Sequence, residues 1–396
     1  MKGQELVGLH YVPLFPYFAS LENEGAFRVV IGHHVTVESG TGIVHIAPTF
    51  GADDARVAKA AGIPPLQLVD KFGNLRPSVD LTGKFYLLSD LDEAYVKENV
   101  NVAEYKKFEG KFVKNAYDPT LTDKDETLDV AICMEMKVNN KAFKIEKHVH
   151  NYPHCWRCKR PLIYKAMDAY YFDIGKIKDR LIELNENINW IPETVKHGRF
   201  GNWLEGARDW NISRNRYWST PIPIWKCDHE GCDHQEVLGS IEEIYEKSGV
   251  RLTDLHRQFM DKVTYTCPVC GGTMRRIPEV LDCWFESGSV PFAQKHYPFE
   301  NKEWFDSHFP CDFIVEYTGQ IRCWFYYLHV LAVALFDRPA FSNCVVHGTI
   351  LAKDGKKLSK SSKNYTDPME LMQKYGTDAF RLYLYQTNAM LIGDLM

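Results

Sequence analysis

The sequence predicts an α/β fold, because strands and helices alternate along its C-terminal third. The run Cys311–Val315 is expected to be a buried strand, and a helical stretch follows it at 321–336. A second apolar run, Cys344–Leu351, leads through a basic loop to a helix start at Asp367-Pro368, where Asp caps and Pro takes the first helical position. If these strands are parallel, the turns after them meet at the carboxyl edge of the sheet, where doubly wound folds bind ligands.

Composition describes an ordinary globular protein. The 396 residues suffice for two or three domains, and 45% of them are hydrophobic and 25% charged. The net charge of −5 gives no support to a nucleic-acid partner, although a local basic patch would be enough to bind one. The N-terminus lacks the apolar core of a signal peptide, and the most apolar stretch, Phe325–Phe336, is too short to span a bilayer, so we expect no membrane association. Eleven cysteines, several in close pairs, suggest metal binding in a reducing compartment, which favours a cytoplasmic location.

The first third, residues 1–150, is expected to be a mixed, β-rich domain. Strand-like runs occupy 27–31 and 42–46, and a helical stretch, Ala55–Ala61, ends at Gly62. Asp53 and Asp54 stand at the start of this helix. They are either the helix cap and a first-turn acid that complements the helix dipole, or carboxylates at the rim of a pocket that binds an ammonium group.

The cysteine pairs predict zinc. A tetrahedral site needs four ligands, so the pair Cys155 and Cys158 could supply only half of one, and a redox pair is the competing interpretation. A second set is complete and comprises Cys227, Cys232, Cys267 and Cys270, the last two in a Cys-Pro-Val-Cys-Gly-Gly turn. This spacing predicts a closed structural zinc site that holds a small ribbon together, with His229 or His234 as substitute ligands.

Two further stretches carry aromatic residues. Arginines alternate with aromatic side chains along 208–218, which suits phosphate and base contacts or a surface held by cation–π contacts. Trp284 lies in the run Leu281–Ser289, where a lone tryptophan is more often part of a core than of a binding site.

The basic loop is the most distinctive segment. Its centre, Lys357-Leu358-Ser359-Lys360-Ser361, follows an Asp354-Gly355 turn, and five lysines fall within Lys353–Lys363. A basic run is most often a solvated face. The alternative is a loop that closes over phosphates, where lysine supplies a point charge late in the reaction.

Taken together, these motifs resemble the isoleucyl-tRNA synthetases, a family of class I aminoacyl-tRNA synthetases. The basic loop is similar to their KMSKS loop with Leu358 in place of Met. The resemblance implies that Lys357 and Lys360 are catalytic, with Lys360 stabilising the departing pyrophosphate. It implies that Trp284 and Trp324 form the amino-acid pocket. The implied ATP and adenylate contacts are His347, Gly348, Glu316, Gln320, Ser359 and Ser361.

The resemblance also extends to the first half of the chain. The run Gly40–Asp54 is similar to part of the family's editing domain, which implies that His45 and Asp54 line a pocket for mischarged valine. In the family the partner of the Cys155/Cys158 pair precedes the editing domain, so this pair would be half of a split zinc site. The family pattern E-G-x-D-Q is not fully matched, because Tyr317 replaces Gly and Gly319 replaces Asp.

The resemblance therefore implies the second half of a class I Rossmann catalytic domain, with a partial β-rich editing domain and a zinc-ribbon insertion. Expected parts are editing (1–150), catalytic segment with zinc insertion (151–300), Rossmann half with its loop (301–366) and the start of a helical region (367–396). ATP, Mg²⁺ and Zn²⁺ are the implied cofactors, and tRNA(Ile) and isoleucine the partners of a monomeric intact enzyme. Neither the HIGH-containing N-terminal half nor the C-terminal anticodon-binding domain of the family is recognised. Without the HIGH half we expect this chain alone to be inactive in ligation. Without the threonine-rich strand that forms the first half of the family's editing pocket, we expect it to be a poor editor. The alternatives are a valyl-tRNA synthetase and a non-catalytic, zinc-bearing tRNA-binding or editing module.

Overall fold

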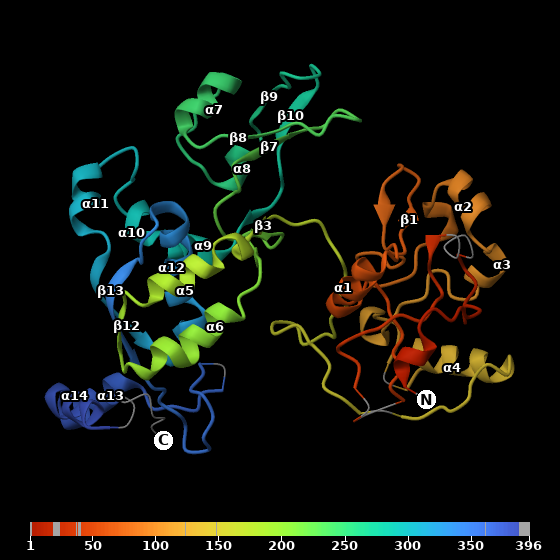
Figure 1. The fold of residues 1–396 in the computed structure, drawn as a ribbon, viewed down its shortest axis with the longest axis horizontal. Helices are drawn as coiled ribbons and strands as arrows, with labels where there is room; N and C mark the ends of the chain where they lie inside the picture. Colours follow the sequence, from red (N-terminus) through yellow and green to blue (C-terminus); the bar gives the residue numbers. More distant parts are fainter. Residues whose placement is uncertain are drawn as a thin grey trace. The chain divides into compact units, whose positions relative to one another are not determined.

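A computed structural model describes residues 2–18, 24–36, 38, 41–122, 124–147, 149–360 and 362–387. Gly40 and Ser361 of the motifs above lie outside these ranges. The chain divides into two compact units, Met1–Asp168 and Ala169–Met396 (Figure 1).

The first unit consists of short helices joined by irregular segments. Its α-helices are α1 (Ala52–Ala61), α2 (Glu93–Asn99), α3 (Val102–Tyr105) and α4 (Leu128–Val138). Its 3₁₀ turns are η1 (Gly3–Leu6), η3 (Leu88–Asp90) and η4 (Asn115–Tyr117). Its two-residue strands β1 (Leu68–Val69) and β2 (Leu75–Arg76) pair antiparallel.

The β-rich expectation is wrong for the described part of this unit. The run 27–31 forms only one bridge, between Arg28 and His10, and 43–46 is not a strand. Ile43 and Val44 are 68% and 51% exposed. A β-branched run becomes a strand through pairing and burial on a sheet, and within the described part of the chain Ile43 and Val44 form no bridge and are not buried.

Helix α1 forms where predicted, with a different cap. Gly51 occupies the N-cap position, so Asp53 and Asp54 both lie in the first turn, where they complement the helix dipole. The expectation that Asp53 is the cap is therefore wrong. Gly62 ends the helix in the left-handed conformation, at φ 67°.

The second unit is built on a parallel sheet in the order β12–β13–β4. Strand β12 runs Cys311–Tyr317, β13 Phe341–His347 and β4 Asn189–Ile191. The predicted α/β architecture with parallel strands is thus confirmed, but β13 begins and ends earlier than the predicted Cys344–Leu351. The last residue pair of the β12–β13 ladder joins Tyr317 to His347. After His347 the chain leaves the sheet as a loop.

Strand β12 was expected to be buried and is not. It is an edge strand in which only Ile314 is buried, while Phe313 and Val315 are 56% and 44% exposed. An edge strand has a neighbour on one side only, which an apolar sequence by itself does not reveal.

Helices pack around this sheet. They are α5 (Lys178–Asn185), α6 (Gly201–Glu205), α9 (Cys283–Gly288), α10 (Val290–Ala293), α11 (Lys302–His308) and α12 (Trp324–Phe336). Shorter elements are η5 (Ile174–Lys176), the π-helical η6 (Lys196–Phe200), the 3₁₀ helix η7 (Thr318–Arg322) and the strands β3 (Tyr171–Phe172), β5 (Trp210–Asn211), β6 (Ser213–Arg214) and β11 (Val280–Leu281). In the pairs β3–β5 and β6–β11 the strands run antiparallel, so the sheets are mixed.

The core of this unit lies between α12 and the sheet. Trp190 on β4 meets Phe325 of α12 and Phe341 of β13 edge to face, each at 6.0 Å between ring centroids. Truncating such a buried aromatic residue typically costs about 3–5 kcal/mol. The helix predicted at 321–336 begins at Trp324, because Thr318–Arg322 forms η7 instead.

An antiparallel four-stranded sheet, β8–β7–β10–β9, forms a separate layer of the second unit. Its strands are β7 (Ile224–Cys227), β8 (Gln235–Val237), β9 (Thr264–Thr266) and β10 (Thr273–Arg276), accompanied by α7 (Ile241–Ser248) and α8 (Arg257–Met260). It lies at the opposite end of the unit from the C-terminal helices (Figure 1).

The C-terminal helices are α13 (Pro368–Tyr375) and α14 (Thr377–Tyr385), divided at Gly376 as predicted. Asp367 caps α13 by accepting a hydrogen bond from the N–H of Met369 at 2.8 Å. Among the helices that the structure describes, none has the length and apolar character needed to cross a membrane.

A buried histidine makes the stability of the second unit sensitive to pH. His329 of α12 is fully buried; its Nε2 donates to the carbonyl of Leu181 at 2.9 Å, and Nδ1 has no hydrogen-bond partner within the described ranges. Burial lowers the pKa of His329 to about 4. Unfolding returns this pKa to about 6.5, so the free energy of unfolding is unaffected above pH 6.5 and falls as the pH drops toward 4. We expect this group to remove about 2 kcal/mol by pH 5.

Urea unfolding at pH 7.5 and pH 5 measures this loss. His329→Leu should flatten the difference between the two pH values, whereas His197→Gln, at an exposed position, should preserve it. An equal pH dependence in His329→Leu would contradict the assignment.

Candidate functional site

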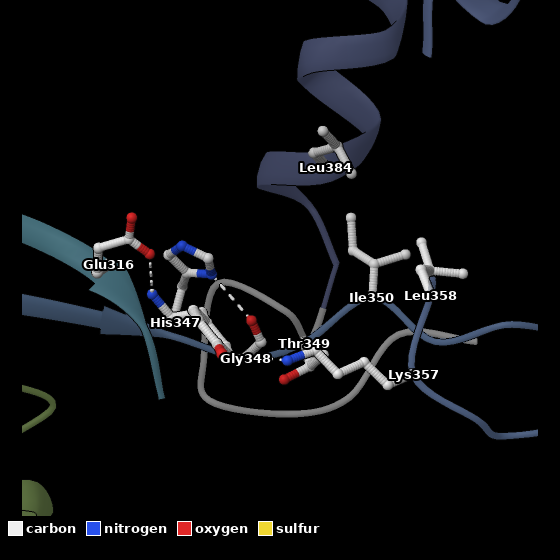
Figure 2. A pocket seen from close by; sticks show the side chains of 9 residues that line it. Glu316, His347, Gly348, Thr349, Ile350, Lys357, Leu358 and Leu384 are labelled. Carbon is white, nitrogen blue, oxygen red and sulfur yellow. Dashed lines mark hydrogen bonds between the residues drawn. The ribbon is translucent and has the colours of Figure 1, made fainter. Parts of the chain in front are cut away.

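A pocket opens at the carboxyl ends of β12 and β13 (Figure 2). Its volume is about 450 Å³. The lining residues are Glu316, Tyr317, His347, Gly348, Thr349, Ile350, Lys357, Leu358 and Leu384. The pocket therefore lies at the edge of a parallel sheet where the sequence predicts ligand binding.

The strand ends fix two polar side chains in this pocket. Nδ1 of His347 donates to the carbonyl of Gly348 at 2.9 Å, which orients the ring. Glu316 accepts the N–H of Tyr317 at 3.0 Å through Oε2. Both side chains leave the sheet at its last residues, so the ladder holds their backbones in place.

The basic loop begins as a tight hairpin. Leu351 and Lys357 form an antiparallel bridge, and the Asp354-Gly355 turn between them forms as predicted, with Gly355 at φ 72°. Asn364 then ties the loop to itself. Its Nδ2 donates to the carbonyl of Lys357 at 3.1 Å, and its Oδ1 accepts the N–H of Ser359 at 2.9 Å.

Lys357 is the lysine that the structure places in the pocket. Its Nζ donates to Oη of Tyr317 at 3.2 Å and lies 5.1 Å from the centroid of that ring. A hydrogen bond to a neutral phenol leaves the ammonium charge intact, so it can still attract an anion.

The other predicted ATP contacts are distributed differently. Glu316, His347 and Gly348 line the pocket with Lys357, whereas Ser359 and Lys360 belong to the loop but not to the lining. Gln320 uses its Oε1 to accept the N–H of Trp324 at 3.1 Å, which satisfies a donor in the first turn of α12.

The two predicted pocket tryptophans lie where α9 packs on α12. Trp284 stacks on Tyr327 with 5.7 Å between ring centroids and 14° between planes. Nε1 of Trp324 donates to the carbonyl of Ser287 at 3.0 Å. Both side chains are partly buried, so each retains some exposed surface.

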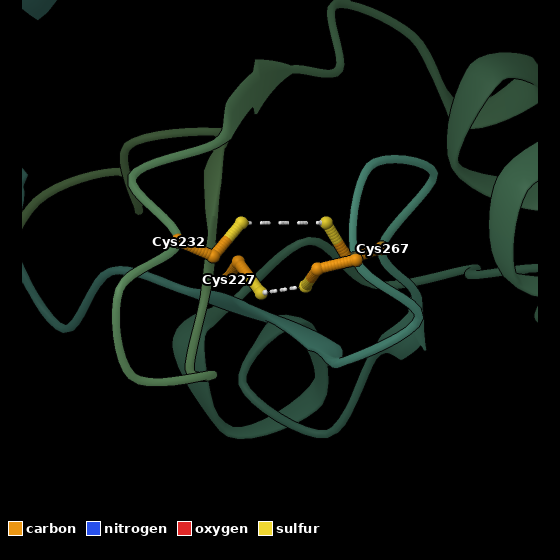
Figure 3. A group of neighbouring side chains, drawn as sticks. Cys227, Cys232 and Cys267 are labelled. Atoms are coloured by element: carbon orange, nitrogen blue, oxygen red, sulfur yellow. Dashed lines mark hydrogen bonds between the residues drawn. The ribbon is translucent and has the colours of Figure 1, made fainter.

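The four cysteines of the ribbon converge (Figure 3). Their sulfur atoms all lie within 4.8 Å of one another, with Sγ–Sγ distances of 3.4 Å for Cys227–Cys270 and 3.9 Å for Cys232–Cys267. Four sulfurs at about 2.3 Å from a tetrahedral zinc would be about 3.8 Å apart, so these residues fit that ion. His229 and His234 are not members of the cluster.

The backbone of the ribbon passes close to the cysteine sulfurs and directs N–H groups at them. The N–H of Gly272 points at Cys270 Sγ, at 3.3 Å, and a Cβ on Gly272 would lie 3.1 Å from Cys227 Sγ and 2.7 Å from His229 Cβ. Burial alone would raise the pKa of Cys267, but the N–H groups of Cys270 and Val269 lower it to about 7. The N–H of His229 lowers the pKa of Cys227, yet burial and the other thiols outweigh it and raise that pKa to about 12. A divalent cation would let all four ionise.

The second cysteine pair remains a prediction. Cys155 is half-buried and Cys158 exposed, and among the described residues no cluster of three or more metal-ligating side chains includes them. The split-site interpretation would need ligands from elsewhere.

The predicted editing residues flank the entry to α1. Oδ2 of Asp54 accepts the N–H of Ala47 at 3.0 Å, which holds the 45–47 segment against the start of the helix. His45 is exposed. Their joint role in one pocket stays a prediction.

Part of the arginine and aromatic stretch 208–218 makes contacts within the protein. Arg257 lies 3.5 Å above the Tyr217 ring, and Arg214 pairs with the buried Asp282 at 3.1 Å. Trp218, in contrast, is 93% exposed. Arg214 and Tyr217 therefore contact other parts of the protein, whereas Trp218 is available for a ligand.

Three contributors to the loop and pocket were missed from sequence. Tyr317 holds Lys357, Asn364 holds the loop, and Leu384 of α14 reaches the pocket from a separate helix. An Asn shortly after a turn-rich basic run is a usable signal, because its side chain commonly bonds to nearby backbone. No local pattern indicates the other two.

Comparison with known proteins shows similarity to tRNA synthetases. The sequence profile of tRNA synthetases class I (I, L, M and V) matches residues 82–394. The chain is 50% identical over 412 residues to an isoleucine–tRNA ligase of Bacteroides fragilis, across 97% of this chain and 36% of the relative. It is also 50% identical over 404 residues to an isoleucine–tRNA ligase of Treponema denticola, across 100% of this chain and 33% of the relative.

Among solved structures, the ternary complex of Agrobacterium radiobacter K84 agnB2 LeuRS, tRNA and LeuAMS matches with a TM-score of 0.35 and 22% identity. The match covers 51% of this chain and 28% of that chain. The chain spans about a third of the length of the curated relatives it matches.

Proposed function

Because this chain belongs to the class I tRNA synthetases, we propose that it is part of an isoleucine–tRNA ligase that activates isoleucine with ATP and transfers it to tRNA(Ile). The observation that carries the proposal is the pocket at the carboxyl edge of the parallel sheet, where His347, Glu316 and Lys357 meet. The identity to relatives named isoleucine–tRNA ligase supports isoleucine as the amino acid.

The proposed chemistry needs no protein nucleophile. A carboxylate oxygen of isoleucine attacks the α-phosphorus of ATP, and the bond from that phosphorus to the β-phosphate oxygen breaks to release pyrophosphate. A ribose hydroxyl of the tRNA end then attacks the carbonyl carbon, loses its proton and displaces AMP. Positioning of the reactants and stabilisation of developing charge would supply most of the rate acceleration.

The residues have separate proposed tasks. Lys357 and Lys360 would stabilise the charge on the departing pyrophosphate, and Mg²⁺ bound to ATP would neutralise part of the same charge. Since Nδ1 of His347 is held by Gly348, a ligand would meet Nε2 of that ring. Ser359, Ser361 and Gln320 would contact the nucleotide, and Trp284 and Trp324 would border the isoleucine side chain.

The remaining parts would support this reaction. The ribbon would bind zinc through Cys227, Cys232, Cys267 and Cys270 as a structural site. His45 and Asp54 would take part in hydrolysing valine attached to tRNA, since one missing methylene gives a binding pocket only about 1–3 kcal/mol of discrimination. The exposed Trp218 would lie near the tRNA acceptor end. We propose that the intact enzyme is a cytoplasmic monomer.

The test is amino-acid-dependent ATP–pyrophosphate exchange. Because the relatives are about three times longer, the chain is fused to the N-terminal segment of the Bacteroides fragilis relative, and isoleucine is compared with valine. We expect the specificity constant for isoleucine to exceed that for valine by about 10- to 200-fold. Exchange that favours valine would support a valyl enzyme instead. No exchange from a folded, zinc-loaded fusion would favour the non-catalytic tRNA-binding module.

A further inference from the structure

Tyr317, the last residue of β12, and Gly319 in η7 are sterically coupled. The ring of Tyr317 lies directly against Gly319, so that a Cβ on Gly319 would overlap Cε2 and Cζ of the tyrosine and lie 2.5 Å from its Oη. Such an overlap lies far inside van der Waals contact, so any side chain at position 319 would displace the ring. The two positions at which this sequence departs from the E-G-x-D-Q pattern are thus one packing unit.

The ring orientation has a consequence for the basic loop. With the ring against Gly319, Oη of Tyr317 reaches Nζ of Lys357 at 3.2 Å, and the ammonium lies 5.1 Å from the ring centroid. The backbone of Lys357 is also bridged to Leu351 and bonded to Asn364. Lys357 is therefore the residue through which the base of the loop is attached to the sheet edge.

We propose that Tyr317 is a positioning residue that docks the loop through Lys357. The ring of Tyr317 can occupy this position only because Gly319 has no side chain. The phenol holds the ammonium at the pocket without neutralising it, so a phosphate can take over the contact. The docking stands on contacts within the chain alone. Its effect on the reaction with ATP rests on the proposed function.

The docking is tested on the 396-residue chain by the rate of tryptic cleavage at Lys353–Lys363, mapped by mass spectrometry. Tyr317→Phe removes Oη and keeps the ring, and Gly319→Ala displaces the ring. We expect each to speed cleavage in this loop by about 2- to 10-fold, the range for one hydrogen bond. Cleavage of the double variant should be no faster than that of the faster single variant, because both substitutions remove the same contact between Tyr317 and Lys357.

Two matched variants serve as controls. Tyr375→Phe alters another tyrosine with a lysine over its ring, Lys374 at 5.0 Å, and Gly198→Ala adds a Cβ that meets no atom within 4 Å. Neither should change cleavage in the loop. Unchanged cleavage in Tyr317→Phe would overturn the docking, and additive effects in the double variant would overturn the coupling. Should Gly319→Ala fail to fold, Tyr317→Phe still decides the docking.

The positioning role is tested in the exchange assay of the fusion protein. We expect Tyr317→Phe to lower kcat by about 3- to 10-fold while KM for ATP changes less than about twofold. A rise in KM with unchanged kcat would overturn the positioning role. A parental fusion without exchange but with a loop that Tyr317→Phe loosens would count against the proposed function and leave the docking established.

Discussion

Replacing Cys267 with serine is expected to abolish zinc binding and to unfold the ribbon, taking the zinc content from about one equivalent to none. Structural zinc contributes roughly 10–16 kcal/mol of apparent binding free energy in small zinc-binding peptides, which exceeds the total stability of most domains. Cys267 is only 2% exposed, and two backbone N–H groups point at its sulfur. Serine would keep the shape but lose the thiolate, which is the metal ligand.

Native mass spectrometry of the purified variant gives the zinc content, and hydrogen exchange reports the ribbon backbone. Trp225 is completely buried there and donates through Nε1 to the carbonyl of Val263 at 2.9 Å, so this segment should lose its protection. Cys133→Ser removes a thiol from the first unit and should leave both readouts unchanged. A Cys267→Ser protein with a full zinc equivalent and a protected ribbon would refute the four-cysteine site.

Sequence reasoning succeeded where short-range chemistry determines the structure. The Asp354-Gly355 turn, the α13 start at Asp367-Pro368 and the C-terminal break at Gly376 form where predicted. The four cysteines of the ribbon, Cys227, Cys232, Cys267 and Cys270, come together as their spacing predicts. Each of these features depends on a few neighbouring residues, and the sequence carries that information directly.

Sequence reasoning failed where a residue's partner lies far along the chain. The runs at 27–31 and 43–46 have strand-like composition. Within the described residues, 27–31 pairs only with the irregular segment 8–11 and 43–46 forms no bridge, so neither joins a sheet. Strand β12 looked buried because its sequence is apolar, whereas its burial depends on its place in the sheet order. The ring of Tyr317 packs against Gly319 only because η7 follows β12 at once, a tertiary detail that no local pattern encodes.

The candidate site was predicted as a set of residues rather than as an arrangement. Glu316, His347, Gly348 and Lys357 meet in one pocket, while Gln320 serves α12 and Ser359 stays within the loop. The resemblance identified which residue types matter, but it could not specify which of the two lysines faces the pocket in this structure. That depends on tertiary contacts: Lys357 is bridged to Leu351 and its Nζ donates to Tyr317 at the end of β12.

Replacing Lys360 with alanine is expected to lower kcat for ATP–pyrophosphate exchange in the fusion protein by about 10²–10³-fold, with a small change in KM for ATP. Removing one preformed stabiliser of developing charge typically has an effect of this size, and a group that acts only on the departing pyrophosphate contributes little to ground-state binding. Exchange rates at saturating isoleucine, with ATP varied, separate the two constants. Lys374→Ala, an exposed lysine on α13, should behave like the parent.

Comparison of the two loop lysines then distinguishes two ways in which the loop could act. Lys360 is exposed and lies outside the pocket lining, so a large effect of its removal requires the loop to move when ATP binds. If the loop instead worked in the arrangement seen here, Lys357→Ala would carry the large loss in kcat and Lys360→Ala would stay within about threefold of the parent. That reversed order would refute Lys360 as the pyrophosphate contact. Large losses in both variants would mean that Lys357 first holds the loop at the pocket and Lys360 follows when it closes.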